Sequence, residues 1–158
     1  MKIKTIDQSK WTEDAWKGAA FGSVFSDHML VVHFKNGKWL EPEIKPYGTI
    51  DMLPSLHALH YGQSIFEGMK AHRTSNDDIL IFRPDMNAKR FAESAERMCM
   101  PAVNEDLFVE AIRQLVKLDS EWVTKRRGHS LYIRPYMFAT DELIGIRPSE
   151  TYKFMIIT

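Results

Sequence analysis

The most regular pattern of apolar and polar positions lies between residues 104 and 118. Asn104 is well suited to cap a helix, and Glu105 and Asp106 favour the positive end of a helix dipole. The apolar side chains that follow recur at helical spacing and form one broad stripe: Leu107, Phe108, Ala111, Ile112, Leu115 and Val116. The pattern predicts an amphipathic helix with one buried face.

A second helix is predicted over residues 85–100. Phe91, Ala95 and Met98 share one of its faces, and Pro101 ends it. These two segments are the only ones in which helical periodicity is sustained, so we expect two helices.

Strands are predicted on both sides of the helices. Asn36-Gly37 readily supplies the positive φ angles of a tight turn, which predicts a hairpin within residues 28–44. A second hairpin is expected around the polar turn at 75–78, and two further strands over 130–139 and 152–158.

Strands and helices do not alternate along the chain, which argues against a doubly wound parallel sheet. We predict an α+β fold: a largely antiparallel sheet with two helices packed on one face. Residues 1–20 are interpreted as an N-terminal lead-in and 21–158 as one domain. Since the chain stops at Thr158 directly after an apolar strand, whereas domains usually end in polar linkers, we expect it to be part of a longer protein.

Composition narrows the class of partner. Lys plus Arg and Asp plus Glu each total 21, so no global charge favours nucleic acid or an anionic membrane. The single cysteine, Cys99, fits a reducing compartment, and no apolar leader is present, so we expect a cytoplasmic protein. His57 and His60 lack the further ligands that a zinc site needs, so we expect no metal.

The strand that begins at residue 130 carries candidate chemistry. Alternation places Ser130, Tyr132, Arg134 and Tyr136 on one face, with apolar residues on the other. A guanidinium between two phenols is suited to binding a carboxylate through two parallel hydrogen bonds. From spacing alone, a solvated sheet face is the slightly commoner explanation.

Lys70 is a candidate nucleophile for a covalently held cofactor. A lysine in that role needs a lowered pKa, usually from burial or a neighbouring cation. Glu67 lies three residues earlier and would stabilise the charged lysine if the two were close. The sequence therefore argues against Lys70 as a nucleophile and makes Glu67 its expected structural partner.

Two other polar residues have both a functional and a structural explanation. Arg90 lies near the start of the second predicted helix, where it can face a bound phosphate, although a surface arginine is commoner. His28 next to Asp27 can form an acid/base pair, but its position at the start of an apolar strand favours a structural hydrogen bond.

Five stretches, read in order, resemble one family: "FGSVFSDHML" (21–30), "LHYGQSIFEGMKAHR" (59–73), "IFRPDMNAKRFAESAERMCMP" (81–101), "LYIRP" (131–135) and "LIGIRPS" (143–149). Together they resemble the N-terminal domain of the branched-chain amino acid aminotransferases, which are fold type IV enzymes that use pyridoxal 5'-phosphate. The likeness runs from about Phe21 to Thr158. It implies substrates of two kinds, branched-chain amino acids and glutamate or 2-oxoglutarate, and an assembly of two or more copies.

The resemblance also implies roles for particular residues. Arg90 matches the arginine that binds the cofactor phosphate, and Arg134 an arginine that holds the second carboxylate of glutamate. Ile144 and Ile146 match loop residues that reach the neighbouring subunit's site. The residues that match the walls of the substrate side-chain pocket are Phe21, Tyr61, Phe66 and Tyr132.

In this family the lysine that holds the cofactor lies in the C-terminal domain, and Lys70 does not match it. The resemblance therefore implies no catalytic residue in this chain and no activity when it is isolated. Two alternatives remain: a related fold type IV enzyme, such as a D-amino acid aminotransferase or a lyase, or a non-catalytic binding domain derived from this fold.

Overall fold

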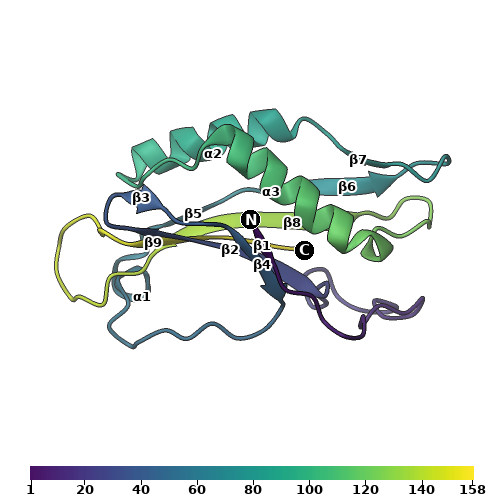
Figure 1. Cartoon of the computed structure of the whole chain (residues 1–158), viewed down its shortest axis with the longest axis horizontal. Helices are drawn as coiled ribbons and strands as arrows, with labels where there is room; N and C mark the ends of the chain where they lie inside the picture. Colours follow the sequence, from purple (N-terminus) through teal and green to yellow (C-terminus); the bar gives the residue numbers. More distant parts are fainter.

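One twisted sheet of nine strands organises the molecule (Figure 1). The computed structural model describes all 158 residues. The strand order is β1-β4-β2-β9-β8-β6-β7, with β3 pairing β2 and β5 pairing β8. All pairs are antiparallel except β1 with β4, which confirms the predicted class. The strands are β1 (Lys2–Ile3), β2 (His28–Lys35), β3 (Lys38–Trp39), β4 (Glu43–Pro46), β5 (Ser64–Phe66), β6 (Met69–Arg73), β7 (Ile79–Ile81), β8 (Leu131–Ala139) and β9 (Tyr152–Ile157).

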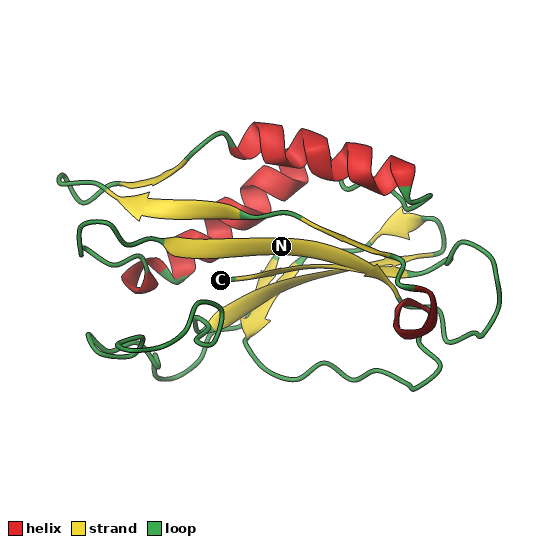
Figure 2. Ribbon diagram, turned by 180° about the vertical axis from the view of Figure 1, so that it is seen from behind, coloured by secondary structure: helices red, strands yellow, loops and turns green.

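Two long helices cover one face of this sheet, as predicted (Figures 1 and 2). Helix α3 (Glu105–Leu118) begins after Asn104, whose side chain accepts a hydrogen bond from the Leu107 amide at 3.0 Å. Helix α2 (Pro84–Arg97) ends earlier than the sequence pattern predicts. Cys99 has left the helix and adopts a φ of 54°.

The main core lies between these helices and the sheet. Phe91 of α2, Phe108 of α3 and Phe154 of β9 form a ring cluster with centroids 5.2 to 5.7 Å apart. All three side chains are essentially inaccessible to solvent. Burial of aromatic side chains of this size contributes about 1.5–3 kcal/mol each, so this layer dominates the stability of the domain.

The opposite face of the sheet carries a smaller apolar cluster of Met29, Val31, Leu56, Phe138 and Met155. The chain between β4 and the short helix α1 (His57–Tyr61) packs against it. Neither α1 nor β5 was predicted, because a five-residue helix leaves too little periodicity to detect. The rest of this second face remains available for a site.

The N-terminal segment is attached at its start rather than free. Strand β1 pairs with β4, and the Asp27 carboxylate accepts hydrogen bonds from the Ser9 hydroxyl, the Lys10 amide and the Trp122 indole. Trp122 belongs to a 3-10 turn, η1 (Ser120–Trp122), that follows α3. Between residues 12 and 24, the backbone hydrogen bonds are local ones. Residues 12–24 therefore form a strap, the name used for them below, that is fixed at both ends. No helix of this chain has the length and apolarity required to cross a bilayer.

Candidate functional site

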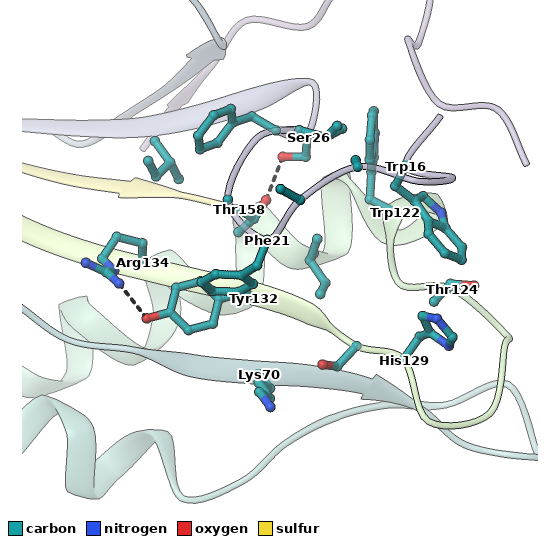
Figure 3. Close-up of a pocket in the computed structure, with 18 residues that line it drawn as sticks. Trp16, Phe21, Ser26, Lys70, Trp122, Thr124, His129, Tyr132, Arg134 and Thr158 are labelled. Atoms are coloured by element: carbon teal, nitrogen blue, oxygen red, sulfur yellow. Dashed lines mark hydrogen bonds between the residues drawn. The ribbon is translucent and has the colours of Figure 1, made fainter. Parts of the chain in front are cut away.

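A hollow of about 570 Å³ lies on the second face of the sheet, under the strap (Figure 3). Its floor is formed by β8 with Lys70 of β6, and one wall by strap residues that include Phe21. The lining residues are Trp16, Ala19, Ala20, Phe21, Gly22, Val24, Phe25, Ser26, Lys70, Trp122, Thr124, His129, Ser130, Leu131, Tyr132, Arg134, Ile157 and Thr158. No aspartate or glutamate is among them.

Arg134 and Tyr132 form the polar centre of the hollow. They lie on the same face of β8, as the alternation predicts, and Arg134 Nη2 donates a hydrogen bond to Tyr132 Oη at 2.8 Å. The guanidinium also lies over the Phe66 ring, 4.4 Å from its centroid. Its Nε–H is buried and has no acceptor in the protein. Arginine carries five N–H donors, so most of this fork is free to bind a carboxylate.

The aromatic wall depends on one glycine. Phe21 meets the Tyr132 ring edge-on with centroids 5.0 Å apart, and Figure 3 shows it pointing toward that ring. A Cβ at Gly68 would lie 2.2 Å from Tyr132 Oη. Only glycine leaves room for this phenol. Gly68 therefore positions the hydroxyl to which Arg134 donates.

Glu67 does not pair with Lys70, so that prediction was wrong. Its carboxylate instead binds Arg90, with Nε–Oε1 at 2.5 Å and Nη2–Oε2 at 2.6 Å, and also accepts from Asn87 at 2.8 Å. Burial disfavours the charged form, but the hydrogen bonds from Arg90 and Asn87 outweigh it and lower the pKa of the Glu67 carboxyl. Proximity in sequence misled here because Glu67 lies in the bend between β5 and β6 and faces α2.

Arg90 lies outside the hollow and is bound on one side only. Two of its nitrogens are occupied by Glu67, whereas Nη1 makes no hydrogen bond to the protein and 62% of the side chain is exposed. Glu67 fixes the guanidinium and leaves an outward donor, which suits an anion. The donor set thus fits one contact to a cofactor phosphate.

Besides Arg90, four predicted site residues lie outside the lining of the hollow. Phe66 is 64% exposed and is linked to the hollow only through its contact with the Arg134 guanidinium. Tyr61, on α1, packs against the His57 ring at 4.7 Å and does not line it. Ile144 and Ile146 project from the loop between β8 and β9 and are 67% and 97% exposed. The ends of that loop are held by Asp141, whose carboxylate binds Arg147 and Thr151. Within this chain the structure brings together Phe21, Phe66, Tyr132 and Arg134.

The sequence analysis missed several residues of the hollow. Trp16 lines it from the strap and is held by His129, whose ring lies 5.0 Å away, and by Arg126 at 4.9 Å. Neither Trp16 nor the basic loop at 125–129 was predicted to belong to a site. The available signal was Trp16 itself, because an indole within a polar segment needs an apolar surface to pack against.

His28 has a structural role, as favoured above, but with a different partner. Its Nδ1 lies 2.6 Å from Asp119 Oδ1, and its Nε2 accepts from the Ile6 amide at 3.2 Å. Asp27 is satisfied separately by Ser9, Lys10 and Trp122. The contact between His28 and Asp119 joins the end of α3 to the start of β2 and lies outside the hollow.

Comparison with known proteins gives one consistent result. No family model matches the chain. It is 47% identical over 138 residues to branched-chain-amino-acid transaminase 1 of Bacillus subtilis, covering 87% of this chain and 39% of that protein. It is 42% identical to the branched-chain-amino-acid aminotransferase of Mycolicibacterium smegmatis, again over 87% of this chain.

Solved structures agree with the sequence relatives. The branched-chain amino acid aminotransferase of Escherichia coli matches 82% of this chain with a TM-score of 0.63 and 26% identity. The T.th. enzyme of the same name, complexed with N-(5'-phosphopyridoxyl)-L-glutamate, matches 80% with a TM-score of 0.60 and 28% identity. The chain spans about two fifths of these proteins (38% and 39%). It is therefore similar, in sequence and in fold, to part of the branched-chain-amino-acid aminotransferases.

Proposed function

We propose that this chain is the N-terminal domain of a branched-chain L-amino acid transaminase that uses pyridoxal 5'-phosphate. The observation that carries the proposal is the meeting of Phe21, Tyr132 and Arg134 in one hollow, with Phe66 against the Arg134 guanidinium. The chain is 47% identical to part of a protein named branched-chain-amino-acid transaminase. The parent exchanges an amino group between leucine, isoleucine or valine and 2-oxoglutarate. The remaining part of the site, including the lysine that holds the cofactor, would come from outside this chain.

The hollow suits both kinds of substrate. Phe21 and the Tyr132 ring offer apolar surface to a branched side chain, which gains free energy by leaving water. Arg134, with free N–H donors, can bind the distal carboxylate of glutamate through charge-assisted hydrogen bonds. When bound, pyridoxal 5'-phosphate supplies the group that accepts and returns the amino nitrogen. The residues of this chain orient the substrate and exclude water around it.

Arg90 is the proposed contact to the cofactor phosphate. Its guanidinium is fixed by Glu67 and keeps Nη1 free. Ile144 and Ile146 are proposed to reach a second subunit, since they project from the loop with little cover in this chain. The unpaired Cys99 supports the proposal of a cytoplasmic, reducing location.

The proposal is tested in a longer protein that includes the expected C-terminal domain. Arg90→Ala should raise the dissociation constant of pyridoxal 5'-phosphate about tenfold or more, because one charge-assisted hydrogen bond to the phosphate is lost. The constant is measured by absorbance after dialysis against known cofactor concentrations. Arg97→Ala, at the exposed far end of α2, is the matched control and should leave it unchanged.

An unchanged cofactor affinity in Arg90→Ala would show that the phosphate lies elsewhere. For the 158-residue chain alone, no absorbance from pyridoxal 5'-phosphate should survive gel filtration. A borohydride-trapped adduct on Lys70, found by peptide mass mapping, would contradict the assignment of the cofactor lysine to the missing part.

A further inference from the structure

The charged side chains that line the hollow are all of one sign. Lys70 and Arg134 are the two permanent cations of the lining, and none of its residues is an aspartate or glutamate. Its other polar side chains are mainly hydroxyls, such as that of Thr124. A concave surface lined by charges of one sign concentrates counter-ions within it. The hollow is therefore built for an anionic ligand with some apolar surface.

Lys70 has no partner that would account for its place. It forms no ion pair, and its side chain makes no hydrogen bond in this structure. The nearest carboxylate in sequence, that of Glu67, is occupied by Arg90 and Asn87. Lys70 is thus an uncommitted cation at the rim of a site.

The register of the sheet places Lys70 near Arg134. Lys70 of β6 lies directly opposite Tyr132 of β8, and Arg134 is two residues further along the same face. Diagonal neighbours of this kind have Cα atoms about 7–8 Å apart, within reach of two long side chains. One small molecule can contact both cations. Arg134 is held inward by the Tyr132 hydroxyl, while Lys70 remains free to follow the ligand.

We propose that Lys70 is a second anion-binding residue of the hollow, which with Arg134 selects acids that carry two carboxylates. The distal carboxylate of such an acid lies between the Arg134 fork and the Lys70 ammonium and accepts charge-assisted hydrogen bonds from both. A branched monocarboxylate has no distal carboxylate to offer these cations. The inference rests on the proposed function and adds to it a residue that discriminates between its two substrates.

The test uses direct binding to the 158-residue chain prepared with an amidated C-terminus, because the free carboxylate of Thr158 would otherwise lie in the lining. Trp16 and Trp122 line the hollow, so their fluorescence reports its occupation. The probes are 2-oxoglutarate and 4-methyl-2-oxopentanoate. Lys70→Gln should raise the dissociation constant of 2-oxoglutarate about tenfold, as expected for loss of one charged hydrogen bond, and change that of 4-methyl-2-oxopentanoate less than about twofold.

Two further variants keep the test specific. Lys70→Arg should restore most of the affinity for 2-oxoglutarate because it keeps the charge. Lys89→Gln removes an exposed lysine of α2 outside the hollow and should leave both acids unaffected. Far-UV circular dichroism confirms that each variant is folded.

Three results would overturn the inference: an equal loss for both acids, no loss for 2-oxoglutarate, or no binding of 2-oxoglutarate by the unsubstituted chain. None of them bears on the proposed cofactor contact, which is tested separately through Arg90 in the longer protein. The two proposals can also fail separately. If Lys70→Gln lost affinity for 2-oxoglutarate alone while Arg90→Ala bound the cofactor normally, Lys70 would stand as a dicarboxylate contact. The role of Arg90 as the cofactor phosphate contact would then be rejected.

Discussion

The two faces of β8 show how one strand serves two purposes. Its inward residues, such as Ile133 and Met137, are fully buried beneath α2 and α3, whereas Tyr132 and Arg134 on the other face are only partly covered. The inner face gains stability from apolar contacts with the two helices. The outer face keeps a buried Arg134 Nε–H without an acceptor, a cost that a ligand can relieve. The contrast separates residues that maintain the fold from residues that bind.

The largest expected loss of stability comes from a substitution in the inner face. Phe154→Ala removes a fully buried ring that touches Phe91 and Phe108, and should lower the free energy of unfolding by about 3–5 kcal/mol. Phe66→Ala is the matched variant on the outer face. That ring is 64% exposed, so its loss should cost less than about 1 kcal/mol. Urea denaturation followed by circular dichroism measures both, and equal losses would contradict the division between the faces.

An intermediate effect on stability is expected at Gly68, where the backbone lies against the Tyr132 side chain. Gly68→Ala places a methyl group against the Tyr132 hydroxyl and should cost about 1–3 kcal/mol of stability. Gly48→Ala is the control, because a Cβ there meets no atom within 4 Å.

The substitution should also move the Tyr132 ring away from Arg134, which nuclear magnetic resonance of the aromatic side chains can follow. If Gly68→Ala left both the stability and the ring signals unchanged, the close approach of Tyr132 would not be a constraint.

The smallest effect concerns the pH dependence of the Glu67–Arg90 pair. Because the pKa of Glu67 is lower in the folded state than its ordinary value of 4.5, the pair stabilises the fold above pH 4.5. That contribution is lost as the pH falls through the lowered pKa. Arg90 is mostly exposed, so we expect less than about 1 kcal/mol.

The measurement compares wild type with Glu67→Gln by urea denaturation at several pH values from about pH 7 down to about pH 2.5. The wild type should lose more stability than the variant over the acid end of this range. A parallel pH dependence in the two proteins would show that Glu67 does not contribute.

The sequence predicted those parts of the fold whose signals are local. The stripe in α3, the Asn36-Gly37 turn and the alternation along β8 each depend on residues close in sequence, and each was confirmed. Helix α1 was missed because it is too short for periodicity. The N-terminal strand β1 was missed because its partner β4 is distant in sequence.

The residues of the candidate site were likewise predictable from the sequence only where their signals are local. Tyr132 and Arg134 follow from strand alternation, while Phe21 and Phe66 required the family resemblance. The partner of Glu67 was assigned by proximity, and only the position of α2 shows that it is Arg90. The contribution of Trp16 depends on a strap whose path no local pattern records.

The place of β9 in the sheet has a consequence for how the domain is made. This strand lies between β2 and β8. Leu30 can pair with Ile44 of β4 on one side, but its partner on the other side, Ile156, comes from β9. Pairings between residues so far apart in sequence form slowly, because a large loop must close first. During synthesis, β2 must therefore wait on the ribosome with one edge open. Until β9 emerges, that edge is exposed to pairing with another nascent chain, and chaperones are expected to shield it.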